Sequence, residues 1–223
     1  MLDGQESGQV EIVPAEEFNK VLDSAFTKRL VPLGFERIKA NRWVHSGHAP
    51  IRRVFALSGL KGLSTAPVWG FSFDFVPHLA GGDEVKWHRT AKSAWLDLPY
   101  DPIDYTHDMK SWSLSRFEPA GALEKAADGL AGKSTEAAVA FWARIGSLED
   151  VPRVFEEWQS RPFVRFGFIN YVHASLVYAF VLARLGRPSD ATAWLERYLA
   201  HDIRDEAKAL LRTRLNEAQL NAV

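Results

Sequence analysis

Residues 67–76 read PVWGFSFDFV and carry an aromatic ring at every second position from Trp69 to Phe75. Successive side chains of a strand point to opposite faces, so this alternation predicts a strand with four rings on one face. Four rings on one face need a large apolar cover. The sequence therefore predicts a sheet with at least one helix packed over it.

A suitable helix is predicted upstream, over residues 15–30. Its apolar residues recur at three- and four-residue spacing and would form one stripe: Phe18, Leu22, Ala25, Phe26 and Leu30. Val31 precedes Pro32, which disfavours helical geometry, and Gly34 can adopt the positive φ that often ends a helix. We expect this helix to end there and to cover the rings.

Strands are predicted over residues 35–39, 42–46, 51–60 and 67–76, separated by short turns and by a loop over residues 59–66. Short connections between successive strands indicate an antiparallel meander. Residues 81–110 are poorly patterned, and Pro99 and Pro102 are expected to interrupt regular structure there. Residues 85–89 and 112–117 are two further candidate strands.

After Pro119 the pattern becomes helical, with candidate helices over residues 120–129, 135–145, 148–159, 170–185, 189–201 and 203–220. The expected fold class is α+β: an antiparallel sheet meander covered by helices, followed by a helical C-terminal half. We expect a sheet region over residues 1–118 and a helical region over residues 119–223 that packs on it as one structural unit.

Composition excludes several classes of protein. The chain has 27 basic and 28 acidic side chains, with 13 and 14 of them before residue 111, so no basic half is present to bind nucleic acid. Cysteine is absent, which excludes disulfides and thiolate metal sites. The N-terminus lacks a signal-peptide pattern, and the most apolar stretch, residues 174–185, is too short to span a membrane. A cytoplasmic protein without membrane contact is expected.

An ordered series of residues resembles the bacterial family catalogued as domain of unknown function 4304, over residues 15 to about 160. It comprises Phe18, Leu22 and Leu30, then Leu33-Gly34-Phe35, then Trp43, then Trp112 before a helical run, and the helix pair of Phe141 and Phe155. Residues 170–201 look like one tetratricopeptide helix pair. The resemblance implies a bacterial cytosolic α+β protein, and some relatives are suspected immunity proteins. It implies no catalytic or binding residues.

Residues 127–135 end like a phosphate-binding P-loop, with Lys133 and Ser134. That motif needs a glycine where Ala127 stands and a strand before it. We therefore expect a helix, a loop and a second helix capped by Ser134. The histidines show no zinc-ligand spacing, so no cofactor or metal is expected.

Asp74, followed by Glu84 and Lys86, imitates the acidic pair and lysine of some metal-dependent nucleases. Two carboxylates on adjacent strands would hold Mg²⁺, and the lysine would position the attacking water. A metal-dependent phosphodiesterase is therefore the alternative function.

Two charged segments and a set of aromatic residues favour a binding function instead. Residues 28–53 carry seven basic side chains and one acidic, whereas residues 74–108 carry seven acidic and three basic. Aromatic residues in irregular acidic loops are typical either of interaction surfaces or of side chains that the loop inserts into the hydrophobic core. The candidate surface comprises Trp87, His88, Arg89, Trp95, Tyr100, Tyr105 and His107. The leading hypothesis is a non-enzymatic binding or interaction protein, with a protein partner or a second copy of the chain.

Overall fold

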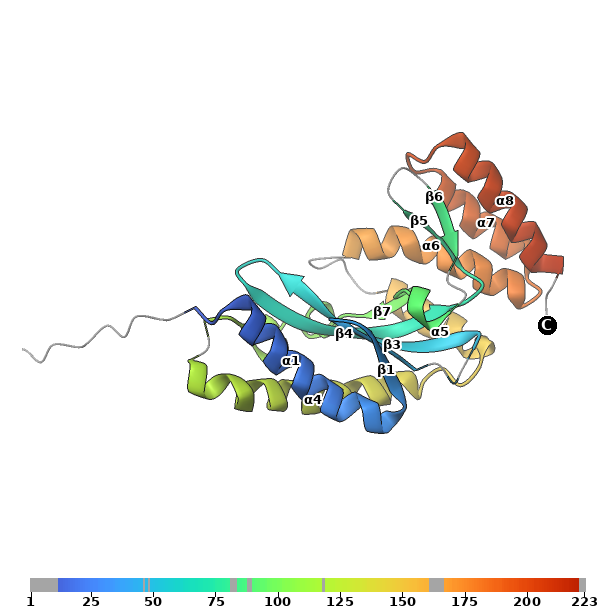
Figure 1. The fold of residues 1–223 in the computed structure, drawn as a ribbon. Coiled ribbons are helices and arrows are strands. Elements are labelled where there is room, and N and C mark those ends of the chain that lie inside the picture. The colour runs from blue at the N-terminus through green and yellow to red at the C-terminus, as the bar shows by residue number, and fades with distance from the viewer. Residues whose placement is uncertain are drawn as a thin grey trace, which may run out of the picture.

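An antiparallel sheet lies at the centre of the protein (Figure 1). The structure is a computed structural model and describes residues 12–45, 47, 49–80, 84–87, 90–117, 119–160 and 167–220. The main strands, in their order across the sheet, are β1 (Phe35–Lys39), β2 (Arg42–His45), β3 (Ile51–Leu60), β4 (Ser64–Phe73) and β7 (Leu98–Tyr100). Strand β8 (Leu114–Ser115) pairs with the beginning of β4. The predicted meander is confirmed for β1 to β4.

Strand β4 begins three residues earlier than predicted and ends three residues earlier. Its pairing with β3 starts at Leu60 opposite Ser64, so only residues 61–63 form the turn. Gly62 and Leu63 both have positive φ there, which makes so short a turn possible. Phe75 consequently lies beyond the end of the strand, half-buried, with its ring 5.7 Å from that of Phe73.

Helix α1 (Ala15–Leu30) has the predicted bounds and covers the ring-bearing face of the sheet over β2 and β3. Phe26 is fully buried, with its ring 5.3 Å from that of Phe55 and 6.1 Å from that of Trp43. A short 3-10 helix follows, and Gly34 ends it with a φ of 85°. The expected helix end at this glycine is therefore confirmed.

A second helix, α4 (Ala120–Trp142), lies beside α1 and completes the cover (Figure 1). Trp142 is buried, and its indole Nε1 donates a hydrogen bond of 2.9 Å to the carbonyl oxygen of Gly70 in β4. The ring of Phe141 packs 5.7 Å from that of Phe71. The rings of β4 are thus covered by two helices, of which the sequence indicated one.

The continuity of α4 corrects the expected helix–loop–helix over residues 120–145. Ser134 does not cap a second helix; its buried hydroxyl donates to the carbonyl oxygen of Leu130 one turn earlier, at 2.6 Å. Burial of Ala127, Ala131 and Ala138 explains why the helix continues through Gly129 and Gly132, because this stripe packs against the core. A P-loop binds phosphate through the free backbone N–H groups of a loop. Because residues 129–134 are part of a continuous helix, they do not form such a loop.

The segment between β4 and α4 is more regular than expected. A hairpin of β5 (Pro77–Ala80) and β6 (Glu84–Trp87) forms a separate two-stranded sheet, followed by the 3-10 helix Ala91–Ser93. Pro99 stands in edge strand β7, and Pro102 opens α2 (Pro102–Thr106), two positions that tolerate a missing N–H. Trp112 ends helix α3 (Met109–Trp112), so the strand predicted from residue 112 is wrong except for β8.

The C-terminal half is helical, as predicted. Its helices are α5 (Val151–Gln159), α6 (Gly167–Arg184), α7 (Pro188–Leu199) and α8 (Asp205–Leu220). Gly186, with a φ of 67°, separates α6 from α7, and these two helices pack against one another as a hairpin. Helices α6 to α8 lie together at one end of the molecule beside the β5–β6 hairpin (Figure 1). No described helix is long and apolar enough to cross a bilayer.

One cluster of buried apolar side chains extends from Phe18 in α1 to Leu215 in α8. The helical half and the sheet therefore share a core, and the fold class is α+β. The opposite face of the sheet has a much smaller cluster, in which Val44 and Val54 pack against Ala94. That face is covered by the short segment around residues 90–96.

Candidate functional site

Trp87, the first residue of the candidate surface, packs against the C-terminal helices. It ends β6, and its ring meets that of Phe180 in α6 edge-on, at 6.4 Å between ring centres. The guanidinium carbon of Arg214 in α8 lies 5.1 Å from the centre of the Trp87 ring. His88 and Arg89 lie outside the described residues.

Trp95 lies on the face of the sheet opposite α1 and α4, and 44% of it is exposed. Its ring stacks on that of His78 with centres 5.4 Å apart and planes 6° apart, and the guanidinium of Arg42 lies 5.1 Å above it. Arg42 also donates to the carbonyl oxygen of Ala94 at 2.9 Å, and burial lowers its pKa. The basic strands and the loop carrying Trp95 therefore meet within one chain at this point.

Tyr100 and Tyr105 belong to the aromatic core around β4. Their rings stack with centres 3.9 Å apart, and Tyr100 also stacks on the buried Trp69 at 5.2 Å. His107 is exposed at the end of α2, where its φ is 57°. The described members of the candidate surface thus lie in separate places and do not form one surface.

The residues of the metal-dependent alternative are also apart. The β5–β6 hairpin pairs Pro77 with Trp87 at its base and Ala80 with Glu84 at its tip. Three residues of strand separate base and tip by roughly 10 Å. Asp74 lies near the base, whereas the exposed Glu84 pairs with Lys86 at 3.1 Å. Within the described ranges, no group of three histidine or acidic residues could hold a metal ion.

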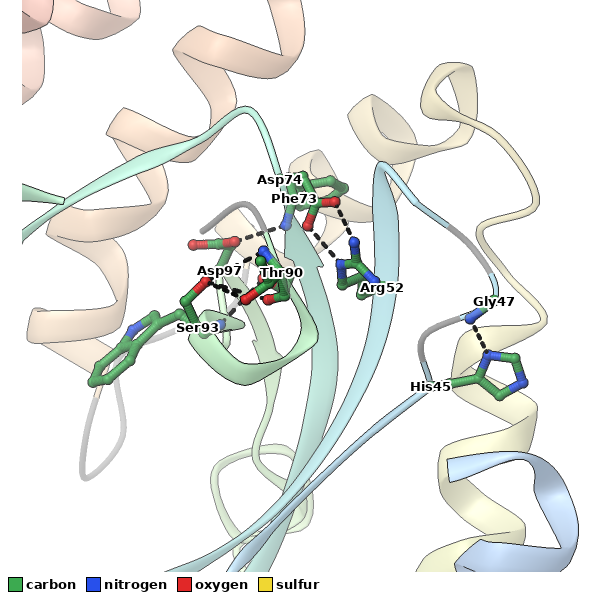
Figure 2. A network of polar contacts seen from close by, with 10 residues as sticks. His45, Gly47, Arg52, Phe73, Asp74, Thr90, Ser93 and Asp97 are labelled. Carbon is green, nitrogen blue, oxygen red and sulfur yellow. Dashed lines mark hydrogen bonds and ion pairs between the residues drawn. The ribbon is translucent and has the colours of Figure 1, made fainter. Parts of the chain in front are cut away.

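Asp74 is held by Arg52 in a two-pronged ion pair at the end of β4 (Figure 2). Arg52 Nε lies 2.7 Å from Asp74 Oδ1, and Nη2 lies 2.7 Å from Oδ2. Both side chains are largely buried, so the pair is weakly screened by solvent. The carboxylate is neutralised locally, which removes most of its negative field from the space around it.

A buried carboxylate, Asp97, joins the sheet to α6. Its Oδ2 accepts a hydrogen bond of 2.7 Å from the backbone N–H of Phe73, as Figure 2 shows, and its Oδ1 lies 3.6 Å from Nε2 of His173. The side chain of Asp97 is fully buried. This group ties the end of β4 and the start of β7 to the helix that forms one wall of the cleft described next.

A cleft of about 340 Å³ lies where the end of β4, the β5–β6 hairpin, α6 and α8 meet. This volume is within the range of small-ligand sites. We call it the first hollow. Its aromatic and basic lining residues are Phe75, Trp87, Phe180, Arg184 and Arg214.

Two arginines of the first hollow have buried donors without an acceptor. The Nε atoms of Arg184 and Arg214 are inaccessible to solvent and form no hydrogen bond with any described residue. Each guanidinium lies over a ring: Arg184 at 5.6 Å from the centre of Phe75, and Arg214 over Trp87. Cation–π contact holds the guanidinium groups in place but leaves their Nε–H donors unsatisfied.

The first hollow is lined by two acidic and two basic residues, which differ in how they are paired. Asp74 is paired with Arg52, and Glu217 is paired with Nη1 of Arg214 at 2.7 Å. Arg184 forms no ion pair with the described residues, and it stands at the C-terminal end of α6, where a positive charge suits the helix dipole. Arg184 is therefore the charged lining residue whose charge no described residue pairs.

A second hollow of about 430 Å³ adjoins the first and shares Pro50, Phe75 and Arg184 with it. Its other lining residues come from β3, β4 and the connection between α4 and α5, and include Arg53, Phe71, Ile145, Gly146, Ser147 and Leu148. The backbone N–H groups of Gly146 and Ser147 are taken by Asp150 Oδ2, and these hydrogen bonds lower the pKa of Asp150. The guanidinium groups of Arg53 and Arg184 are thus the strongest hydrogen-bond donors that the second hollow offers to an anion.

Sequence reasoning missed these two hollows because their residues come from β3, β4, β6, α6, α8 and a loop. One signal pointed to them: the most apolar stretch of the chain, residues 174–185, contains a single cation, Arg184, near its end. A cation at the end of a buried helix has to lie at the rim of the core.

Comparison of the chain with protein-family models, curated proteins and solved structures found no match. The resemblance to the domain of unknown function 4304 family therefore stays a prediction. Function has to be argued from the geometry of the hollows.

Proposed function

We propose that the protein is a non-enzymatic binding protein whose first hollow takes a ligand with one anionic group on an apolar or aromatic body. The observation that carries this proposal is the guanidinium of Arg184, which lines the first hollow and forms no ion pair with any described residue. A hydrogen bond between a guanidinium and an anion contributes about 1.5–3 kcal/mol.

The rest of the lining supports the same ligand class. Phe75 and Trp87 are half-buried and offer ring surfaces against which an apolar body would pack. The ion pair of Arg52 with Asp74 reduces repulsion between that carboxylate and an incoming anion. Glu217 is exposed and already paired with Arg214, so its charge opposes the anion only weakly.

Calorimetric titration with phenyl phosphate, an anion attached to a ring, tests the proposal. We expect phenyl phosphate to bind more tightly than inorganic phosphate or phenol at the same ionic strength. Arg184→Met keeps an unbranched stem but removes the charge, and should weaken binding at least tenfold, since a hydrogen bond to a charged group contributes about 1.5–3 kcal/mol.

Arg212→Met is the matched control. Arg212 is on the same helix as Arg214 but is exposed and paired with Glu196 at 2.8 Å, away from the hollow. This variant should bind phenyl phosphate as the natural protein does. An absence of binding in the natural protein, or equal affinity in Arg184→Met, would contradict the proposal.

A further inference from the structure

The two hollows adjoin one another, since both are lined by Pro50, Phe75 and Arg184, and we call the two together the groove. The first hollow is the first arm of the groove and includes Arg214 in α8. The second hollow is the second arm and includes the connection between α4 and α5. A ligand that fills only the first hollow would leave the second arm empty.

Each part of the groove has an arginine. Arg214 lies in the first arm, Arg184 at the junction and Arg53 in the second arm. Among the described residues, Arg53 forms no ion pair, and the lining of the second hollow includes no carboxylate. The positive charge of the groove is therefore not confined to the first hollow.

Apolar surface separates these cations. Phe75 lies at the junction, and Phe71, Ile145 and Leu148 line the second arm. An occupant that complements the whole groove needs two anionic groups, one toward Arg184 and Arg214 and one toward Arg53, with an apolar group between them. This pattern of charge and apolar contact is that of an acidic peptide segment with a central aliphatic residue.

We propose that the groove binds an acidic, extended segment of a protein partner, with two carboxylates on either side of an apolar side chain. This inference rests on the proposed function of the first hollow and extends it to the second. Arginine forks bind carboxylates in two-pronged geometry, and clusters of arginine are a recurrent means of recognising acidic motifs. A nucleic acid, whose phosphates follow one another without interruption, matches less well a groove in which apolar residues lie between the arginines.

Fluorescence polarisation with a labelled peptide that carries two glutamates flanking one leucine tests the inference. The natural protein should bind this peptide at least fivefold more tightly than the same peptide with glutamines. Arg53→Met should weaken peptide binding at least fivefold and leave phenyl phosphate binding unchanged, because Arg53 lines only the second hollow. Arg184→Met should weaken the binding of both ligands, and Arg212→Met should weaken neither.

The outcomes separate the two proposals. If phenyl phosphate binds but the peptide does not, or if Arg53→Met leaves peptide binding intact, the acidic-segment inference is wrong and the proposed function stands. If neither ligand binds, the proposed function fails as well. Tighter binding of a single-stranded thymidine oligonucleotide, weakened by Arg53→Met, would overturn the peptide in favour of a nucleic acid.

Discussion

The carbonyl oxygen of Leu98 lies so close to Gly70 that a Cβ atom on Gly70 would approach it to 2.1 Å. Gly70 pairs with Pro99 across the β4–β7 ladder, and its own carbonyl oxygen accepts the hydrogen bond of Trp142. The absence of a side chain at this position therefore lets β7 dock on the sheet while α4 is anchored on the same residue.

Replacing Gly70 by alanine should therefore destabilise the protein. Because the contact is with backbone, β7 has to move, and we expect a loss of about 2–3 kcal/mol in the free energy of unfolding by urea. Gly59→Ala in β3 is the control, since a Cβ atom there would meet nothing within 4 Å. Equal stability of Gly70→Ala and Gly59→Ala would show that β7 does not dock as described.

Asp97 is expected to be important for stability although it lies outside any regular element. Asp97→Ala leaves the buried N–H of Phe73 without its acceptor and should cost about 1–3 kcal/mol in urea denaturation. Asp202→Ala, in the exposed turn before α8, should change stability by less than about 0.5 kcal/mol. A similar small effect of both substitutions would argue against the buried link between β4 and α6.

Trp95 and Tyr100 should respond differently to truncation. Tyr100→Ala removes a ring stacked between Trp69 and Tyr105 and should cost about 3 kcal/mol. Trp95 is half-exposed on the opposite face, so Trp95→Ala should cost clearly less, about 1 kcal/mol, through its contacts with Arg42 and His78. Thermal unfolding of both variants checks this order, and the reverse order would mean that Trp95 is a plug for the core.

Tyr178 should make the protein sensitive to alkaline pH. Burial, with the nearby carboxylate of Glu156, raises the pKa of Tyr178 from 10 to about 12. Because the folded state holds the phenol proton more tightly than the unfolded state, this contribution to stability is complete below pH 10 and is lost as pH rises from 10 to 12. The urea midpoint should fall less steeply over this range in Tyr178→Phe than in the natural protein. Identical slopes would contradict the raised pKa.

Local patterns in the sequence were enough to predict α1 and the first four strands. The alternating rings of β4 and the apolar stripe of α1 are clear sequence patterns because each element buries one face. Burial of one face requires apolar residues at every second position of a strand and at every third or fourth position of a helix. Helix α4 was predicted as two helices because glycine, lysine and serine over residues 129–134 are typical of a loop. The alanine stripe that packs against the core outweighed that local preference.

The candidate site could not be predicted in the same way. Aromatic residues between Trp87 and Tyr105 looked like one surface because they are near each other in sequence. In the fold, β6 carries Trp87 to the C-terminal helices, Trp95 lies on a different face of the sheet, and Tyr100 and Tyr105 stack together beside β4. The two hollows depend on Arg53, Arg184 and Arg214, and the first and last of these are 161 positions apart in the sequence. Only the tertiary fold brings these three arginines to one groove.

The most direct test of the proposed binding site is a nitrogen–proton correlation spectrum of the arginine side chains, recorded during titration with phenyl phosphate. Arg184→Met and Arg214→Met assign the two Nε–H signals by their disappearance. We predict that both signals move on addition of phenyl phosphate, because an anion bound in the first hollow changes the surroundings of both guanidinium groups, while the Nε–H signal of Arg212, already bonded to Glu196, does not move. Unchanged Arg184 and Arg214 signals at saturating phenyl phosphate would contradict the site.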